Sequence, residues 1–223
     1  ADIEKIYLTA SGGPFLGKDR AFLSKVTKEH ALKHPNWVMG AKITIDSASL
    51  MNKGLEVIEA KWLFGLEPEQ VDVIVHPQSI VHSLVQFKDG SIKAQLGLPD
   101  MKLPIHYAFN YPDRQKTDFE RFNFLNYPNL TFTAPDMEAF PNLGLAYKAL
   151  KKGGNMPCII NAANEIVVDA FLHNKIGFLE MSDVIQACME GVGFIATPAL
   201  HNYLETDTHT RIFAKELVTK GVG

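Results

Sequence analysis

A hydroxyl, an amide, an ammonium and a carboxylate follow one another between residues 47 and 56 of the chain. They belong to Ser47, Asn52, Lys53 and Glu56, in the stretch D-S-A-S-L-M-N-K-G-L-E that starts at Asp46. Hydroxyl, amide and ammonium groups bind phosphate, and on a helix Glu56 shares a face with Asn52 and Lys53, which precede it by four and three residues. A carboxylate one turn deeper can hold a metal ion or carry a proton. The pattern predicts an anion site beside an acid, and this combination suggests chemistry on a phosphorylated sugar.

The residues around this group indicate a strand that leads into a helix. Residues 42–45 contain a β-branched run, and Asp46 or Ser47 is then a suitable helix N-cap. The spacing that follows predicts one apolar helical stripe, made of Met51, Leu55, Ile58 and Trp62. We therefore expect the positive pole of the helix dipole and its free backbone N–H groups to face the anion.

A second candidate for anion binding is the turn T-A-S-G-G-P, from Thr9 to Pro14. Ser11 stands there beside two glycines, so a hydroxyl and backbone N–H groups can converge on one anion. The stretch lacks the full spacing of a phosphate-binding loop, and alone it is more typical of a plain turn. The helix start at Ser47 is a second such element, and two anion sites at strand ends of one domain favour the functional interpretation.

The segment H-P-N-W-V-M-G, from His34 to Gly40, places a large aromatic side chain in a loop. Trp37 either fastens this loop to the core or forms part of a lid that excludes water, with Gly40 as its hinge. Both interpretations remain open from these residues alone.

His76 and His82 are not spaced as a metal-binding pair, and we expect hydrogen-bonded histidines near strand ends. Glu165 is expected to make polar contacts between helices.

Composition narrows the class of protein. With 223 residues, 46% hydrophobic content and a net charge of −3, the chain can bury a substantial core and has no sustained basic block for nucleic acid. Cys158 and Cys188 are far apart, which favours buried thiols in a reducing compartment over a disulfide framework. There is no apolar run long enough to cross a bilayer. We therefore expect a soluble protein with no nucleic-acid or membrane partner.

The order of the expected elements predicts an α/β (α+β) fold. Residues 1–110 form a catalytic and dimerisation domain with a mainly parallel or mixed sheet, residues 111–136 a connector, and residues 137–223 a C-terminal four-helix domain. The expected strands are 3–9, 71–75, 80–87 and 91–97, the last two joined by a turn at 88–90. The expected helices are 23–32, 142–152, 159–173, 183–190 with Ser182 as its cap, and 208–219.

Read together, the motifs resemble those of 1-deoxy-D-xylulose 5-phosphate reductoisomerases, the isoprenoid-precursor enzymes of bacteria and plastids. The resemblance extends over essentially the whole chain and rests on A-S-G-G-P-F at Ala10, H-P-N-W-V-M-G at His34, D-S-A-S-L-M-N-K-G-L-E at Asp46, H-P-Q-S at His76, L-P-D-M at Leu98 and N-A-A-N-E at Asn161. It implies rearrangement of 1-deoxy-D-xylulose 5-phosphate and reduction by NADPH to 2-C-methyl-D-erythritol 4-phosphate, with Mg or Mn as the divalent metal.

The resemblance also implies roles for particular residues. Glu56 and His34 would be catalytic, and Glu56 would be a metal ligand. Gly40, Met39 and Met101 would lie at the NADPH site. The substrate would be bound by Ser11, His34, Trp37, Ser47, Asn52, Lys53 and Glu56, with the phosphate held by the two serines together with Asn52 and Lys53.

Two features of the family's pattern do not occur in this chain. Family members begin with an NADPH-binding Rossmann domain, followed by an Asp-Ser-Glu segment that supplies further metal ligands. We therefore expect the chain to be part of a longer bacterial cytoplasmic enzyme, with a plastid-type organelle as the other location, and to be inactive alone. The open hairpin strand, with Val81, Val85 and Phe87 on one face, predicts a homodimer. The alternative is a stand-alone phosphosugar-binding or oligomerisation module without catalysis, which a start codon next to Ala1 in the gene would favour.

Overall fold

A four-stranded mixed sheet lies at one side of the molecule. The computed structural model describes residues 2–35, 37 and 39–221. Strand β1 (Ile3–Ala10) pairs in parallel with β2 (Val71–Val75) and antiparallel with β3 (Val81–Phe87), giving the order β2-β1-β3-β4. Strand β4 (Ile92–Leu96) closes the predicted hairpin. All four expected strands are confirmed.

The predicted strand over residues 42–45 is wrong, because this segment is helical. Helix α3 (Ala41–Ala48) runs through it, and helix α4 (Met51–Phe64) follows after Leu50, whose φ of 59° is left-handed. Thr44 donates its hydroxyl to the carbonyl of Gly40, 2.8 Å away, and Ile45 is fully buried. Tertiary burial therefore outweighs the β preference of the branched side chains. The N-cap prediction fails with it, because Asp46 lies inside α3.

Helix α4 buries only part of the predicted stripe. Met51 is buried and Leu55 and Ile58 pack against the core, but Trp62 is 70% exposed, so the prediction is wrong for Trp62 alone. The buried positions of the helix are Met51, Gly54, Val57 and Ala60. A Cβ atom built at Gly54 would lie only 2.6 Å from the Cβ of Ala146, so this glycine permits close packing of α4 on helix α6 (Pro141–Lys152). This close contact between α4 and α6 determines which face of α4 is buried.

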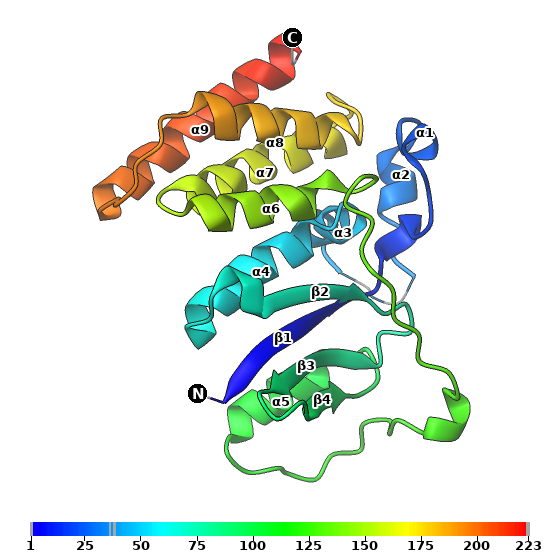
Figure 1. The fold of residues 1–223 in the computed structure, drawn as a ribbon. Helices are drawn as coiled ribbons and strands as arrows, with labels where there is room; N and C mark the ends of the chain where they lie inside the picture. Colours follow the sequence, from blue (N-terminus) through cyan, green and yellow to red (C-terminus); the bar gives the residue numbers. More distant parts are fainter. Residues whose placement is uncertain (1, 36, 38, 222–223) are drawn as a thin grey trace.

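Four helices form the C-terminal part, as predicted. After α6 come α7 (Met156–Leu172), α8 (Glu180–Gly191) and α9 (Leu200–Lys220). Figure 1 shows them stacked on the side of α4 that faces away from the sheet. Ser182 is buried within α8 and is not its cap, and α9 begins eight residues before the expected Thr208. The buried apolar core continues from β1 and β2 through α4 into all four helices.

Short helices fill segments for which less structure was predicted. The expected helix 23–32 consists of two single turns, α1 (Arg20–Leu23) and α2 (Lys28–Ala31). The proline-rich stretch contains helix α5 (Lys102–Asn110), because Pro104 falls in the first helical turn, where its missing N–H is tolerated. Three-residue 3-10 turns complete the list: η1 (Gly13–Phe15), η2 (Pro68–Gln70) and η3 (Phe124–Asn126). The domain boundaries near residues 110 and 137 stay predictions.

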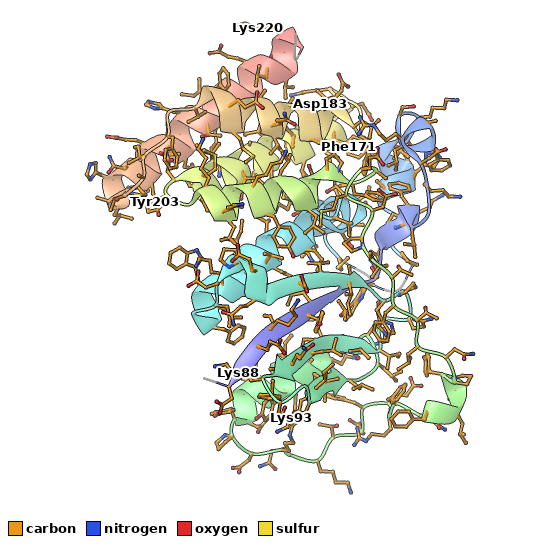
Figure 2. All side chains as sticks on the ribbon, viewed as in Figure 1. Lys88, Lys93, Phe171, Asp183, Tyr203 and Lys220 are labelled. Carbon is orange, nitrogen blue, oxygen red and sulfur yellow. The ribbon has the colours of Figure 1, made fainter. Side chains whose placement is uncertain are left out.

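Charged side chains are spread over the surface. Figure 2 shows Lys88 and Lys93 on the hairpin, far from Lys220 at the end of α9. Over the described ranges, no helix combines the length and the apolar character needed to cross a bilayer.

Candidate active site

A cavity of about 1330 Å³ opens where β1 ends and brings nearly all of the predicted site residues together. Its walls come from the turn after β1, the 34–40 loop, α3, α4, the hairpin, and α5 with the residues that follow it. The predicted residues that line it are Ser11, His34, Trp37, Met39, Ser47, Asn52, Lys53, Glu56 and Met101. Gly40 is not one of the lining residues and instead precedes α3, where its carbonyl accepts the Thr44 bonds.

The turn after β1 and the end of α3 meet at one corner of this cavity. Gly12 and Gly13 have left-handed φ values of 85° and 64°, and the N–H of Gly13 donates to the Ser11 hydroxyl at 3.2 Å. A Cβ at Gly13 would lie 3.0 Å from the carbonyl oxygen of Ser47. Glycine therefore allows the turn to touch α3, and both serines line the cavity as a result.

The N-terminus of α4 adds positive polarity to the same cavity. The helix begins at Met51, so Asn52 and Lys53 belong to its first turn, where backbone N–H groups have no intrahelical acceptor. Sequence reasoning placed the helix start earlier, at Asp46 or Ser47. The structure instead divides the motif between two helices, and the dipole pole lies nearer to Lys53 than predicted.

Asn52 and Lys53 both reach Glu56, as their spacing predicts. The Asn52 amide donates to one oxygen of Glu56 at 2.7 Å, and the Lys53 ammonium contacts the other oxygen at 2.5 Å. The side chains of Lys53 and Glu56 are 15% and 32% exposed, so the pair is partly shielded from water but open to the cavity. A cation, an amide and a carboxylate therefore stand together at the helix end.

His34 connects the 34–40 loop to the Ser11 turn. Its Nδ1 accepts a hydrogen bond from the backbone N–H of Trp37 at 3.0 Å, so the proton of the neutral ring lies on Nε2, which is 3.0 Å from the Ser11 hydroxyl. Burial lowers the pKa of His34, which keeps the imidazole neutral at neutral pH. Asn36 and Val38 of this motif lie outside the described residues.

Sequence reasoning missed several residues of the cavity wall. His82 lines it, donates from Nε2 to the carbonyl of Gly97 at 3.1 Å and contacts the Trp37 ring edge-on, with 6.4 Å between centroids. Burial lowers the pKa of His82, against the opposing effect of its hydrogen bond to Gly97. Tyr107 was missed because α5 was not predicted, and Arg114, which follows this helix, was missed with it. The Cζ atom of Arg114 lies 4.3 Å from the centroid of the Tyr107 ring.

The interpretations of the other polar residues are confirmed. His76 is fully buried, with Nδ1 2.9 Å from the carbonyl of Thr131 and Nε2 accepting from the N–H of Ile80 at 3.1 Å. Glu165 forms an ion pair with Arg211 of α9 at 2.6 Å, which is a contact between helices. Cys188 is buried and Cys158 is partly buried.

The residues present do not complete a magnesium site. Mg²⁺ prefers six oxygen ligands, but within the described ranges no three His, Cys, Asp or Glu side chains are grouped to hold a metal. Glu56 and Asp100 are the carboxylates that line the cavity, and Asp100 accepts the backbone N–H of Lys102 at 2.9 Å. The sequence also lacks the glycine-rich strand-to-helix turn that binds the pyrophosphate of a dinucleotide. This chain supplies one predicted metal ligand, Glu56.

The cavity combines the N-terminus of a helix, a turn that carries a hydroxyl group, and a carboxylate, and its wall is partly apolar. These are features of an α/β domain that binds a small phosphorylated ligand. Two family models match the chain. The model described as "DXP reductoisomerase C-terminal domain" matches residues 96–213, and one described as "1-deoxy-D-xylulose 5-phosphate reductoisomerase C-terminal domain" matches residues 1–64. The chain belongs to the 1-deoxy-D-xylulose 5-phosphate reductoisomerase family.

Individual relatives give the extent of this similarity. The chain is 62% identical over 218 residues to the 1-deoxy-D-xylulose 5-phosphate reductoisomerase of Bacteroides fragilis, covering 98% of this chain and 56% of the relative. A solved reductoisomerase from Zymomonas mobilis, in complex with NADPH, is 43% identical with a TM-score of 0.90, covering 99% of this chain and 56% of that one. Another, in complex with NADPH, fosmidomycin and magnesium, is 41% identical with a TM-score of 0.92, covering 99% and 57%. The chain thus spans about half the length of these relatives.

Proposed function

We propose that this chain is the substrate-binding part of an enzyme that converts 1-deoxy-D-xylulose 5-phosphate into 2-C-methyl-D-erythritol 4-phosphate with NADPH and a divalent metal. The observation that carries the proposal is the convergence of Ser11, Ser47, Asn52, Lys53 and Glu56 on one cavity. Family membership supports the reaction, and the solved relative in complex with NADPH, fosmidomycin and magnesium supports the cofactors.

The phosphate of the substrate binds at the corner between β1, α3 and α4. Ser11 and Ser47 donate hydroxyl hydrogen bonds, Asn52 donates from its amide, and Lys53 supplies the positive charge at the helix pole. In the free protein Lys53 and Asn52 contact Glu56, so phosphate binding exchanges these contacts for stronger bonds to a dianion. Fixing the phosphate orients the remote carbon atoms, which do the chemistry.

The carbon skeleton then extends along the cavity toward His34 and Trp37. His34 is neutral and carries its proton on Nε2, so it donates a hydrogen bond to a substrate oxygen once that oxygen replaces Ser11 as acceptor. Trp37 covers the ligand and excludes water while the carbon skeleton rearranges. Met39 and Met101 give the cavity an apolar wall, and with Gly40 they are proposed to lie beside the nicotinamide.

We further propose that the chain alone binds substrate but does not turn it over. Glu56 is a single predicted metal ligand, and no dinucleotide-binding turn occurs in the sequence. The divalent metal, when bound, polarises oxygens of the substrate, and it needs ligands beyond Glu56. NADPH oxidation followed at 340 nm should show no turnover with substrate and Mg²⁺, whereas calorimetry should detect phosphosugar binding. Turnover at ordinary enzyme rates would refute this, and absence of binding would refute the proposed site.

A homodimer through the hairpin is part of the proposal. Strand β4 is an outer strand of the sheet (Figure 1). Its residue Ile92 is 52% exposed. Val85 and Phe87 of β3 are partly exposed, but Val81, which was expected on the same open face, is buried. An unpaired edge with apolar side chains favours pairing with a second copy. Sedimentation of the chain should give twice the monomer mass, and an I92K variant should sediment as a monomer.

A further inference from the structure

A carboxylate is buried between α3 and the helical bundle, next to the proposed phosphate site. Asp46 is 2% exposed, and its Oδ1 accepts a hydrogen bond from the amide of Asn164 on α7 at 2.9 Å. Its Oδ2 lies 2.6 Å from the ammonium of Lys42, one turn earlier on α3. Asn164 is 1% exposed. Both carboxylate oxygens therefore have partners, and one of those partners belongs to another part of the chain.

Helix α3 depends on such contacts for its position. It has eight residues, too few for an isolated helix to be stable in water. Leu50, which joins it to α4, has a left-handed φ of 59°, and this conformation is unfavourable for a leucine. The helix packs against α7, α4 and η1, and the buried bond from Asn164 is a directional contact on the bundle side. The placement of α3 is thus decided by tertiary contacts.

Asp46 and Ser47 are neighbours on α3 that face different surroundings. Successive helical residues point about 100° apart, so Asp46 faces α7 while Ser47 lines the cavity. The carbonyl of Ser47 also touches the Gly13 turn, which carries the Ser11 side of the site. A movement of α3 away from α7 would therefore displace the Ser47 hydroxyl and the contact with the Ser11 turn together.

We propose that Asn164 is a positioning residue for the phosphate site, acting through its hydrogen bond to Asp46. The helical bundle thereby holds α3 at the place from which Ser47 reaches the phosphate. This inference rests on the proposed function and extends it, because it assigns a role in substrate binding to a bundle residue that lines no part of the cavity. The buried bond acts at a distance through the rigid α3, without contact between Asn164 and the ligand.

An exchange of the two groups tests this role. N164D places two carboxylates against each other and should weaken calorimetric binding of 1-deoxy-D-xylulose 5-phosphate to the full chain by about three- to tenfold. This is less than the full value of a hydrogen bond to a charged group, because the bond acts on the ligand only through α3. The double variant D46N/N164D again pairs an amide with a carboxylate at these positions, and it should recover most of the affinity. If N164D does not fold, N164S removes the amide and gives the same comparison against the unaltered chain.

A matched control separates positioning from general stability. Thr206 accepts a buried hydrogen bond from Asn155 at 3.0 Å, at the N-cap of α7 and away from Asn164 in the middle of that helix. T206V should lower the thermal midpoint while leaving the dissociation constant unchanged. Equal affinity of folded N164D and the unaltered chain, or equal weakening in T206V, would overturn the positioning role alone. If the unaltered chain does not bind the phosphosugar, the proposed function fails, and this inference fails with it.

Discussion

Lys53 offers the sharpest test of the phosphate site. Its ammonium is the cation of the first turn of α4, its side chain is only 15% exposed, and in the free protein it pairs with Glu56. K53M keeps the length and the apolar stem of the side chain but removes the charge. The variant should therefore fold and leave the cavity intact, while phosphate loses its cationic partner.

The size of the effect follows from two opposing contributions. A hydrogen bond from a charged group to the phosphate is worth about 1.5–3 kcal/mol. Phosphate binding also breaks the partly exposed Lys53–Glu56 pair, which offsets up to about 1 kcal/mol of that gain. Subtracting the full offset leaves a net loss in K53M of about 0.5–2 kcal/mol, or a dissociation constant about 2- to 30-fold larger.

Calorimetric titration with 1-deoxy-D-xylulose 5-phosphate measures this loss. The matched control is K61M, the same change two turns further along α4, where Lys61 donates to the carbonyl of Leu66 and does not line the cavity. K61M should bind like the unaltered chain, and added salt should weaken the unaltered chain more than K53M. Equal affinities of K53M and the unaltered chain, or equal losses in both variants, would refute the assignment of Lys53.

Three further predictions concern stability, each measured by urea unfolding. G54A should lower the free energy of unfolding by about 1–3 kcal/mol, because its new Cβ would lie 2.6 Å from that of Ala146; unchanged stability would contradict the close packing. Burial raises the pKa of Cys188 from 9.0 to about 12, so stability should fall as pH rises through this range, and less steeply in C188A. Burial lowers the pKa of His34 and His82 from 6.5, so stability should fall below that pH, and H34N or H82N should reduce the fall.

The local chemistry of the site could be predicted from the residues alone. The spacing of Asn52, Lys53 and Glu56 already places them on one helical face, because it depends only on helical periodicity, and the structure brings them together. The strands and the hairpin were also predictable, since alternation and an Asp-Gly turn are local signals. Helical periodicity and turn preferences were enough to predict the structure where the interacting residues are close in sequence.

Features that depend on residues far apart in the sequence could not be predicted and follow from the tertiary structure. Residues 42–45 carry a strand-like pattern but form α3, because burial of Ile45 and the bond between Asp46 and Asn164 reward a helix there. The place of His82 in the cavity and the exposure of Trp62 likewise follow from packing between elements far apart in the chain. A local pattern contains no information about such neighbours, so the meeting of α3, α4 and the Ser11 turn at one corner could be established only from the folded molecule.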